Sequence, residues 1–453
     1  MPSTRFELWR DRSLRFATGS GATISNALFG VIRNKWLATH LQTMGLGILA
    51  QSTSAQAWLG TLAGMGLGLP VGRVVGAARG KDDDPAVRRT VWTALCLIGL
   101  GSLVVAAAGF LFAGPISRVL LGSPDHALLI RVAALGGAGF AIQGLLFGLF
   151  AGRSDLKANL TLSVVGGLAS VAVTLALVPR WGLLGGAIGI AVLAPAGIAG
   201  VLLLDRRSYV GLLRPVPRPP LDLALARSIL AVGAAVVLLT LVDLGTMIAV
   251  RSHYLGLHGP AANGLLQAAL ALSQQVGALF YAYLSNYAFG KVSGLEGAAE
   301  IRVYTRRHWR PLIALAALLF ASAMVSSTPL LHILYSSRFD PARPMMAWAL
   351  WGEFCRVGMN AWAVGALPIG GARLWLSVGL APSIGLGLSY ALLSHTQLGT
   401  LSLPLAYACA GLFSLCFGGI AMSRAGVTLS RRDVGFWMGS ALALAALARW
   451  VAR

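Results

Sequence analysis

Residues 344–370 read PMMAWALWGEFCRVGMNAWAVGALPIG, an apolar run with two opposite charges near its centre. The run is long enough to cross a bilayer as a helix, since about 20 apolar residues suffice. Glu353 and Arg356 lie ten and thirteen residues after Arg343, so both are expected near mid-depth. A charge at that depth costs about 2.5–3.5 kcal/mol on insertion scales. Such residues are therefore expected to face protein or water and to have partners.

A separation of three residues places Glu353 and Arg356 on one helical face, and Asn360, four residues further on, extends that face. Two interpretations fit this pattern. The charges form an internal ion pair that only aids packing, or they line a polar central cavity. We favour the cavity because other apolar runs also carry ionisable residues.

These further ionisable residues lie in the first, second and seventh apolar runs. They are Arg33 and Lys35, then Arg73, then Asp243 and Arg251. For Arg33, Lys35, Arg73 and Arg251 the alternative is snorkelling to a membrane interface. Together with the central pair the set is five basic and two acidic, a balance that suits an anionic ligand. Arginine in particular suits phosphate through its forked donors.

The eighth apolar run adds uncharged polar side chains at helical spacing, namely Gln267, Gln274, Tyr281 and Ser285. Amides and phenols on one stripe can contact sugar hydroxyls. The alternative is hydrogen bonding between neighbouring helices.

The composition as a whole is that of a membrane protein. Of the 453 residues, 57% are hydrophobic and 11% are charged, and the mean hydropathy is +0.75. The net charge is +21, but the basic residues cluster between apolar runs, which indicates membrane topology and no nucleic-acid partner. No metal-binding spacing, redox motif or soluble catalytic signature is present, so we expect neither a cofactor nor enzyme activity.

Twelve apolar runs of spanning length follow one another along the chain. They lie near 16–38, 45–72, 91–113, 128–151, 159–178, 183–204, 226–250, 261–288, 311–328, 345–368, 374–394 and 399–422. With a cytoplasmic N-terminus, 24 of the 36 Lys and Arg fall in inward segments. We therefore expect an all-α polytopic membrane protein with its N-terminus in the cytoplasm.

The expected domains follow from these runs. Residues 1–204 form one six-helix bundle, 205–224 a basic, proline-rich cytoplasmic connector, and 225–424 a second six-helix bundle. Residues 425–453 form a basic segment followed by a short helix at 435–448, which is either interfacial or a thirteenth span.

The two halves are related by a constant offset of 214 in the numbering. ANLTLSV (158–164) then aligns with ARLWLSV (372–378) at five of seven positions. Because six spans is an even number, both halves have the same orientation, which predicts a pseudo-two-fold axis along the membrane normal. This arrangement is typical of transporters whose substrate site lies between two bundles.

The chain resembles the bacterial polysaccharide (O-antigen type) flippases of the multidrug/oligosaccharidyl-lipid/polysaccharide exporter superfamily. The resemblance is strongest at residues 330–373, which contain a phenylalanine, a glycine–acid–x–x–base motif and a tryptophan. These are Phe339, Gly352, Glu353, Arg356 and Trp362. The run TMGLGILAQSTSAQAWLGTLAGMGLGLPVGRVVGAARGKDD (43–83) also matches. The chain departs from the family at Phe289–Gly290, where many members have a proline.

The resemblance implies a flippase of the bacterial inner membrane that moves undecaprenyl-diphosphate-linked oligosaccharide by alternating access, with no cofactor beyond a possible Na⁺ or H⁺ coupling ion. Arg33, Lys35, Arg73, Arg251 and Arg356 would offer positive charge to the substrate. Asp243 and Glu353 would orient these bases or carry coupling protons. Implied partners are the lipid bilayer, a polysaccharide polymerase and a chain-length regulator.

Three other classes remain open. A multidrug or cation antiporter of the same superfamily would need more acidic residues in the spans. A membrane glycosyltransferase or polymerase would have long outward loops with clustered acids, and the outward loops here are short. A scaffold without transport is disfavoured by the charges within the spans.

Overall fold

The computed structural model describes residues 5–77, 85–153, 155–204, 223–292, 294–295 and 297–452. Over these ranges the chain is helical apart from short turns, and they include no β-strand. The expected all-α class is confirmed. The predicted connector at 205–224 lies outside the described residues except for its last two positions.

The first half of the chain contains both long and short helices. They are α1 (Arg5–Gly64), α2 (Gly68–Ala77), α3 (Pro85–Leu111), α4 (Ala113–Leu121), the 3₁₀-helix η1 (Pro124–His126), α5 (Ala127–Arg153), α6 (Leu156–Ala191) and α7 (Leu193–Leu204).

The second half repeats this order and adds a terminal helix. Its elements are α9 (Leu223–Tyr283), the π-helix η2 (Leu284–Ala288), α10 (Phe289–Val292), α11 (Gly297–Val325), α12 (Ser327–Leu334), the 3₁₀-helix η3 (Ser337–Ala342), α13 (Arg343–Ala363), α14 (Ala366–Leu393), the 3₁₀-helix η4 (Gly399–Leu401), α15 (Ser402–Arg424) and α16 (Arg431–Val451).

Four long helices are broken by a residue with non-helical backbone angles. The breaks lie at Gln42 in α1, at Gly182 in α6, at Gly259 in α9 and at Gly371 in α14. At Gly259 φ is 80° and Pro260 follows, a combination that ends one helix and starts the next. By length and apolar composition, the described residues contain eight helices able to cross a membrane, or nine if the bent pair Ser25–Gly64 and Gly68–Gly76 is counted as one span. The count of twelve crossings remains a prediction.

The terminal helix α16 spans 21 residues, Arg431–Val451, and is long and apolar enough to cross a membrane. It is longer than the predicted 435–448. Ser430 caps its N-terminus by accepting from the Asp433 amide, and the Asp433 carboxylate accepts from the Ser430 amide in return. The sequence left an interfacial and a spanning helix open, and this length is sufficient for a span.

The internal repeat is visible in the element boundaries. The chain breaks at Phe112 between α3 and α4, and at Ser326 between α11 and α12, which is the same offset of 214 in the numbering. The short helix η1 falls within η3 when it is moved by this offset. The repeat inferred from sequence therefore extends to local structure, and positions related by the offset can be compared.

By packing, the chain divides into two compact units. Unit 1 contains residues 1–40 and 51–241, and unit 2 contains 41–50 and 242–453. The boundaries between the two units fall inside two long helices, α1 and α9. They therefore differ from the chain-order boundaries expected at 204 and 225. The assignment of six spans to each bundle remains a prediction.

In unit 1, α2 and α5 pack through two glycine rows. Gly68, Gly72 and Gly76 on α2 face Gly144, Gly148 and Gly152 on α5. A Cβ at Gly148 would overlap the Gly68 carbonyl, so the two backbones are in direct contact. Such small-residue rows allow close approach where no hydrophobic effect drives helices together.

Replacing Gly148 by alanine is expected to separate α2 from α5 and destabilise the protein by about 1–3 kcal/mol, the usual cost of overpacking. The measurement is thermal unfolding of purified protein in detergent. Gly144→Ala on the same helix is the matched control, because nothing lies within 4 Å of a Cβ there. Equal melting temperatures for the two variants would mean that the backbones are not in tight contact.

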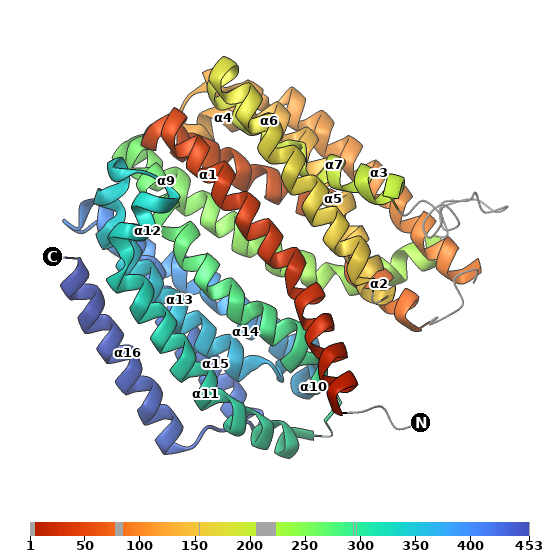
Figure 1. The fold of residues 1–453 in the computed structure, drawn as a ribbon, viewed down its shortest axis with the longest axis vertical. Coiled ribbons are helices and arrows are strands. Elements are labelled where there is room, and N and C mark those ends of the chain that lie inside the picture. Colours follow the sequence, from red (N-terminus) through yellow and green to blue (C-terminus); the bar gives the residue numbers. More distant parts are fainter. Residues whose placement is uncertain are drawn as a thin grey trace. The chain divides into compact units, whose positions relative to one another are not determined.

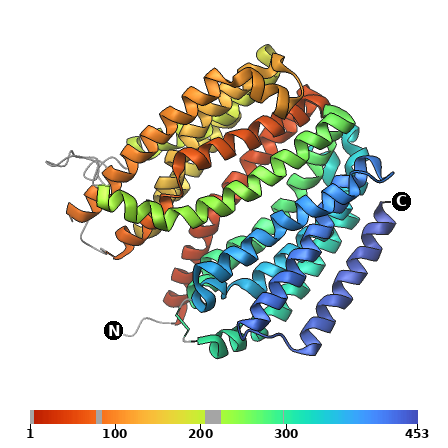
Figure 2. The same ribbon diagram turned by 180° about the vertical axis from the view of Figure 1, so that it is seen from behind.

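In unit 2, α13 is the central helix. It packs on α15 on one side, and on α11 and α16 on the other, and α14 packs on α15 (Figures 1 and 2). Gly352 of α13 approaches the α15 backbone near Ala408. On the other side the Trp351 indole donates to the Ala441 carbonyl of α16 at 2.8 Å. These contacts fix the helix that carries the central charges.

Candidate functional site

The Glu353 carboxylate of α13 is held by two other helices of unit 2, α9 and α15. The side chain is 1% exposed. The Tyr281 hydroxyl of α9 donates to Oε1 at 2.7 Å, and the Tyr407 hydroxyl of α15 donates to Oε2. Gly277, one turn before Tyr281, leaves the space that the carboxylate occupies, because a Cβ there would overlap Oε1. The site is thus a cradle formed by one glycine and two phenols.

Arg356 joins the same network through Tyr407. Its Nη1 donates to the Tyr407 hydroxyl at 2.7 Å, and its guanidinium lies 5.2 Å from the centre of that ring. In the part of the chain that the structure describes, no ion pair within 4.0 Å joins Arg356 to Glu353. The two charges share a helical face as expected, but Tyr407 connects them.

A second carboxylate lies on the other side of Arg356. Asp243 Oδ1 is 3.9 Å from Arg356 Nη2 and accepts from the Ser383 hydroxyl of α14 at 3.0 Å. The Asp243 side chain is 54% exposed, whereas that of Arg356 is 21% exposed. Arg356 therefore lies between a buried acid, reached through Tyr407, and an open one.

Two of the predicted amides, Gln274 and Asn360, lie in different places relative to the network around Glu353. Gln274 is exposed on α9 and interacts with the Tyr407 hydroxyl, which places it at the edge of the network. Asn360 lies one turn after Arg356 on α13. Its amide donates to the Arg356 carbonyl at 2.9 Å, within α13.

Arg251 and Gln267 form a separate buried network in unit 2. Arg251 is 3% exposed and donates to Asn263 Oδ1 at 3.1 and 3.0 Å and to Gln267 Oε1 at 2.8 Å. Asn263 in turn donates to the Gly47 carbonyl at 2.9 Å. The guanidinium is held by neutral amides that lie across the turn at Gly259, and among the described residues no carboxylate lies within 4.0 Å of it.

The remaining predicted bases belong to unit 1. Arg33 Nη1 donates to Ser170 on α6 at 3.0 Å, while its buried Nε has no hydrogen-bond partner among the described residues. Lys35 is partly exposed on α1, and Arg73 is exposed on α2. The network around Glu353 contains neither of these two.

Sequence reasoning missed Tyr407, Ser383 and Gly277. Tyr407 lies in an alanine-rich apolar run, where a tyrosine reads as ordinary core. Gly277 is one of 56 glycines, and only its position opposite Glu353 distinguishes it. Two charges near mid-depth need polar partners on other helices. This need is the signal that could have pointed to Tyr407.

Comparing equivalent positions in the two halves of the chain helps to distinguish a structural role of this network from a functional one. When the offset of 214 is subtracted, Glu353, Arg356 and Tyr407 correspond to Gly139, Ile142 and Leu193. In the same way Asp243 and Tyr281 correspond to Phe29 and Leu67. The first half forms the corresponding helices without any of these polar groups. The fold therefore does not require the network.

Replacing Tyr407 by phenylalanine is expected to cost about 1–3 kcal/mol, because Arg356 loses an acceptor and Glu353 a donor. In a Glu353→Gln background the same change is expected to cost less, with a coupling of about 0.5–3 kcal/mol. The measurement is thermal unfolding of the four proteins in detergent. Tyr390→Phe is the control, because that hydroxyl bonds to His253 elsewhere in unit 2. Additive costs for Tyr407→Phe and Glu353→Gln would contradict the bridge.

Comparison with known proteins gives a family and a fold. Residues 17–255 match the sequence profile of a family described as "Polysaccharide biosynthesis protein". No curated protein sequence matches the chain. Similar solved structures include an inward-facing multidrug resistance MATE family transporter of the MOP superfamily, at TM-score 0.69 and 14% identity over 94% of this chain and 96% of that one.

Two further structures are similar over nearly the whole chain. The lipid II flippase MurJ in an inward closed conformation has TM-score 0.69 and 12% identity, covering 96% of each chain. The MATE multidrug transporter DinF-BH has TM-score 0.63 and 16% identity, covering 94% of this chain and 96% of that one. At these identities the likeness establishes the fold alone, and it confirms the expected polytopic helical architecture.

Proposed function

The chain belongs to the polysaccharide biosynthesis protein family, and from this premise we propose that it flips undecaprenyl-diphosphate-linked oligosaccharide across the bacterial inner membrane by alternating access. The proposal rests chiefly on the charged network of unit 2, which the first half of the chain lacks at the same offset. A polar head group cannot cross hydrocarbon unaided, so a carrier must replace its water.

In this proposal Arg356 is the main cation for the diphosphate or for acidic sugars, since it already lies between two acids. Arg33, Lys35, Arg73 and Arg251 add positive charge along the path. Gln267, Gln274 and Asn360 offer amides to sugar hydroxyls. Of these, Gln274 is exposed beside the network, and it is the amide that the geometry favours most.

Glu353 and Asp243 have different tasks in the proposal. Glu353 is buried and held by two phenols, which suits orientation of Arg356 through Tyr407. Asp243 is open and 3.9 Å from the guanidinium, which suits release and recapture of Arg356 as substrate passes. Either acid is available to carry a coupling proton. The proposed N-terminus is cytoplasmic, and the proposed partners are a polysaccharide polymerase and a chain-length regulator.

The direct test uses proteoliposomes that contain purified protein and a lipid-linked oligosaccharide on both leaflets. An added membrane-impermeant glycosidase should cleave about half of the glycan in empty vesicles and nearly all of it when the protein is present. Cleavage that stops at the outer leaflet, with correctly inserted protein in the vesicles, would rule the proposal out.

A multidrug or cation antiporter is the second candidate, supported by the two acids in unit 2 and by the structural likeness to MATE transporters. It predicts that the same vesicles accumulate a cationic dye when a Na⁺ or H⁺ gradient is imposed. We expect no such accumulation, because bases outnumber acids in the apolar runs.

A further inference from the structure

Two acids share one base in the charged network of unit 2. Asp243 Oδ1 lies 3.9 Å from Arg356 Nη2, while Glu353 reaches Arg356 through Tyr407. Among the described residues, no other basic nitrogen lies within 4.0 Å of either carboxylate. With both acids ionised, the network therefore holds more negative than positive charge. An anionic substrate that binds there would increase this imbalance.

The two acids are held with different firmness. Glu353 is buried and accepts from the hydroxyls of Tyr281 and Tyr407. Asp243 is exposed and accepts a single hydrogen bond, from Ser383 at 3.0 Å. Its distance of 3.9 Å to the guanidinium is longer than a hydrogen bond. Asp243 is therefore the acid that can separate from the base at the lower cost.

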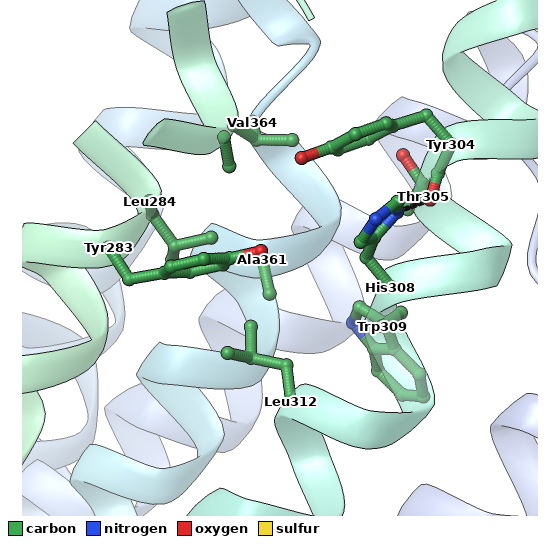
Figure 3. A pocket seen from close by; sticks show the side chains of 10 residues that line it. Tyr283, Leu284, Tyr304, Thr305, His308, Trp309, Leu312, Ala361 and Val364 are labelled. Carbon is green, nitrogen blue, oxygen red and sulfur yellow. Dashed lines mark hydrogen bonds between the residues drawn. The ribbon is translucent and has the colours of Figure 1, made fainter. Parts of the chain in front are cut away.

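Arg356 can be approached from the side of Asp243. Of its two partners, Tyr407 is buried and Asp243 is exposed. The pocket drawn in Figure 3, with Tyr283 and Tyr304 on opposite sides, has room for about one water molecule and is lined by none of the groups of the network. An anion thus reaches the guanidinium by taking the place of the exposed carboxylate.

This exchange leaves Asp243 without its cation. The anion then accepts from Arg356, and the carboxylate keeps only the Ser383 hydroxyl. Two negative groups close together disfavour the ionised form of each. A proton from water converts the carboxylate to a carboxylic acid, which removes one charge and creates a donor that can bond to the anion.

The other groups around this site keep their protonation state. Phenols ordinarily ionise near pH 10 and guanidinium groups above about 12, so neither exchanges a proton near neutral pH. Glu353 keeps both of its phenol donors when an anion arrives. The titratable and charged groups near Asp243 come from α9, α13 and α15, whereas α14 contributes the hydroxyl of Ser383; they are Tyr281, Glu353, Arg356 and Tyr407.

We infer that an anion at Arg356 takes the place of Asp243, and that Asp243 takes up one proton from water in the same step. The inference rests on the proposed function, because it takes the substrate diphosphate to be this anion. It selects the proton over Na⁺ as the coupling ion. A Na⁺ ion held by the same two acids would lie beside the guanidinium, and the two positive charges would repel each other.

The test is proton uptake by the purified protein in detergent as it binds the symmetric dimethyl diester of diphosphate. This probe carries two negative charges and no proton that titrates near neutral pH, so only protons bound by the protein are counted. Titration calorimetry in buffers of different ionisation enthalpy gives the number. We expect about one proton per anion, and an affinity that falls by up to about tenfold for each unit of rising pH.

Three variants assign the proton. Asp243→Asn keeps an acceptor for Ser383 but binds no proton, so it should bind the probe at least as tightly as the wild type, without proton uptake and without pH dependence. Glu353→Gln should still take up a proton. Asp340→Asn is the matched control, because it removes an acid that pairs with His332 elsewhere in unit 2, and it should behave as the wild type. Size exclusion checks that each variant folds.

Four results would each overturn the inference. They are the absence of probe binding, binding without proton uptake in the wild type, uptake that persists in Asp243→Asn, and binding that depends on Na⁺ and not on pH. The vesicle assay of the proposed function is separate. Flipping without proton uptake here would overturn this inference alone, whereas proton uptake in a protein that does not flip glycan would overturn only the proposed function.

Discussion

Replacing Arg356 by alanine is expected to lower glycan export by at least about tenfold while the protein inserts at its normal level. The change removes the charged donor to Tyr407 and the cation nearest Asp243. A hydrogen bond to a charged group contributes about 1.5–3 kcal/mol, and about 1.4 kcal/mol corresponds to a tenfold change in rate. Glu353→Ala is expected to have a similar effect, because Tyr281 and Tyr407 lose a buried acceptor.

The measurement is surface glycan in a strain whose only copy is the variant, normalised to the amount of protein in the membrane fraction. Arg343→Ala, at the start of the same helix, is the matched control, since Arg343 lies outside the network. Arg356→Lys should be intermediate, because one ammonium group cannot span Tyr407 and Asp243 as a guanidinium does. Wild-type export by both alanine variants would reduce the pair to a packing role.

The fold could be predicted from the sequence because a lipid environment imposes strict limits on the backbone. Every backbone group in hydrocarbon must be satisfied within a helix, so apolar length alone identifies most crossings. The repeat offset of 214 was equally accessible, and it recurs at the breaks Phe112 and Ser326. The full length of α16 was harder to predict, since its first turn, with Arg431 and Arg432, is polar.

The candidate site could be predicted from the sequence only in part. A glutamate and an arginine within an apolar run identify themselves by their cost in lipid. Their partners do not, because tyrosine, serine and glycine are all common in membrane helices. Which of them meets Glu353 depends on how α9 and α15 pack on α13. The π-helix η2 could not be predicted either, since a π-helix has no distinct residue signature.

Replacing Gly277 by alanine is expected to reduce export nearly as much as removing Glu353 itself. A Cβ at this position would occupy the space of the Glu353 carboxylate, with Oε1, Cγ and Cδ all too close. The carboxylate cannot move without losing Tyr281 or Tyr407. A single methyl group therefore breaks the network while every polar side chain remains. Surface glycan and membrane protein level are measured as above.

Gly256→Ala is the control for this substitution, because it lies on the first arm of the same helix α9 and nothing is within 4 Å of a Cβ there. Alanine also favours the helix over glycine by about 1 kcal/mol, so general damage to α9 is not a competing explanation. The decisive comparison is the double variant. If Gly277 acts only through the carboxylate, Gly277→Ala adds no further loss in a Glu353→Ala background, because the space is then empty. A further drop in export there would place the role of Gly277 in helix packing, and normal export by the single variant would mean that the carboxylate is not held where the structure places it.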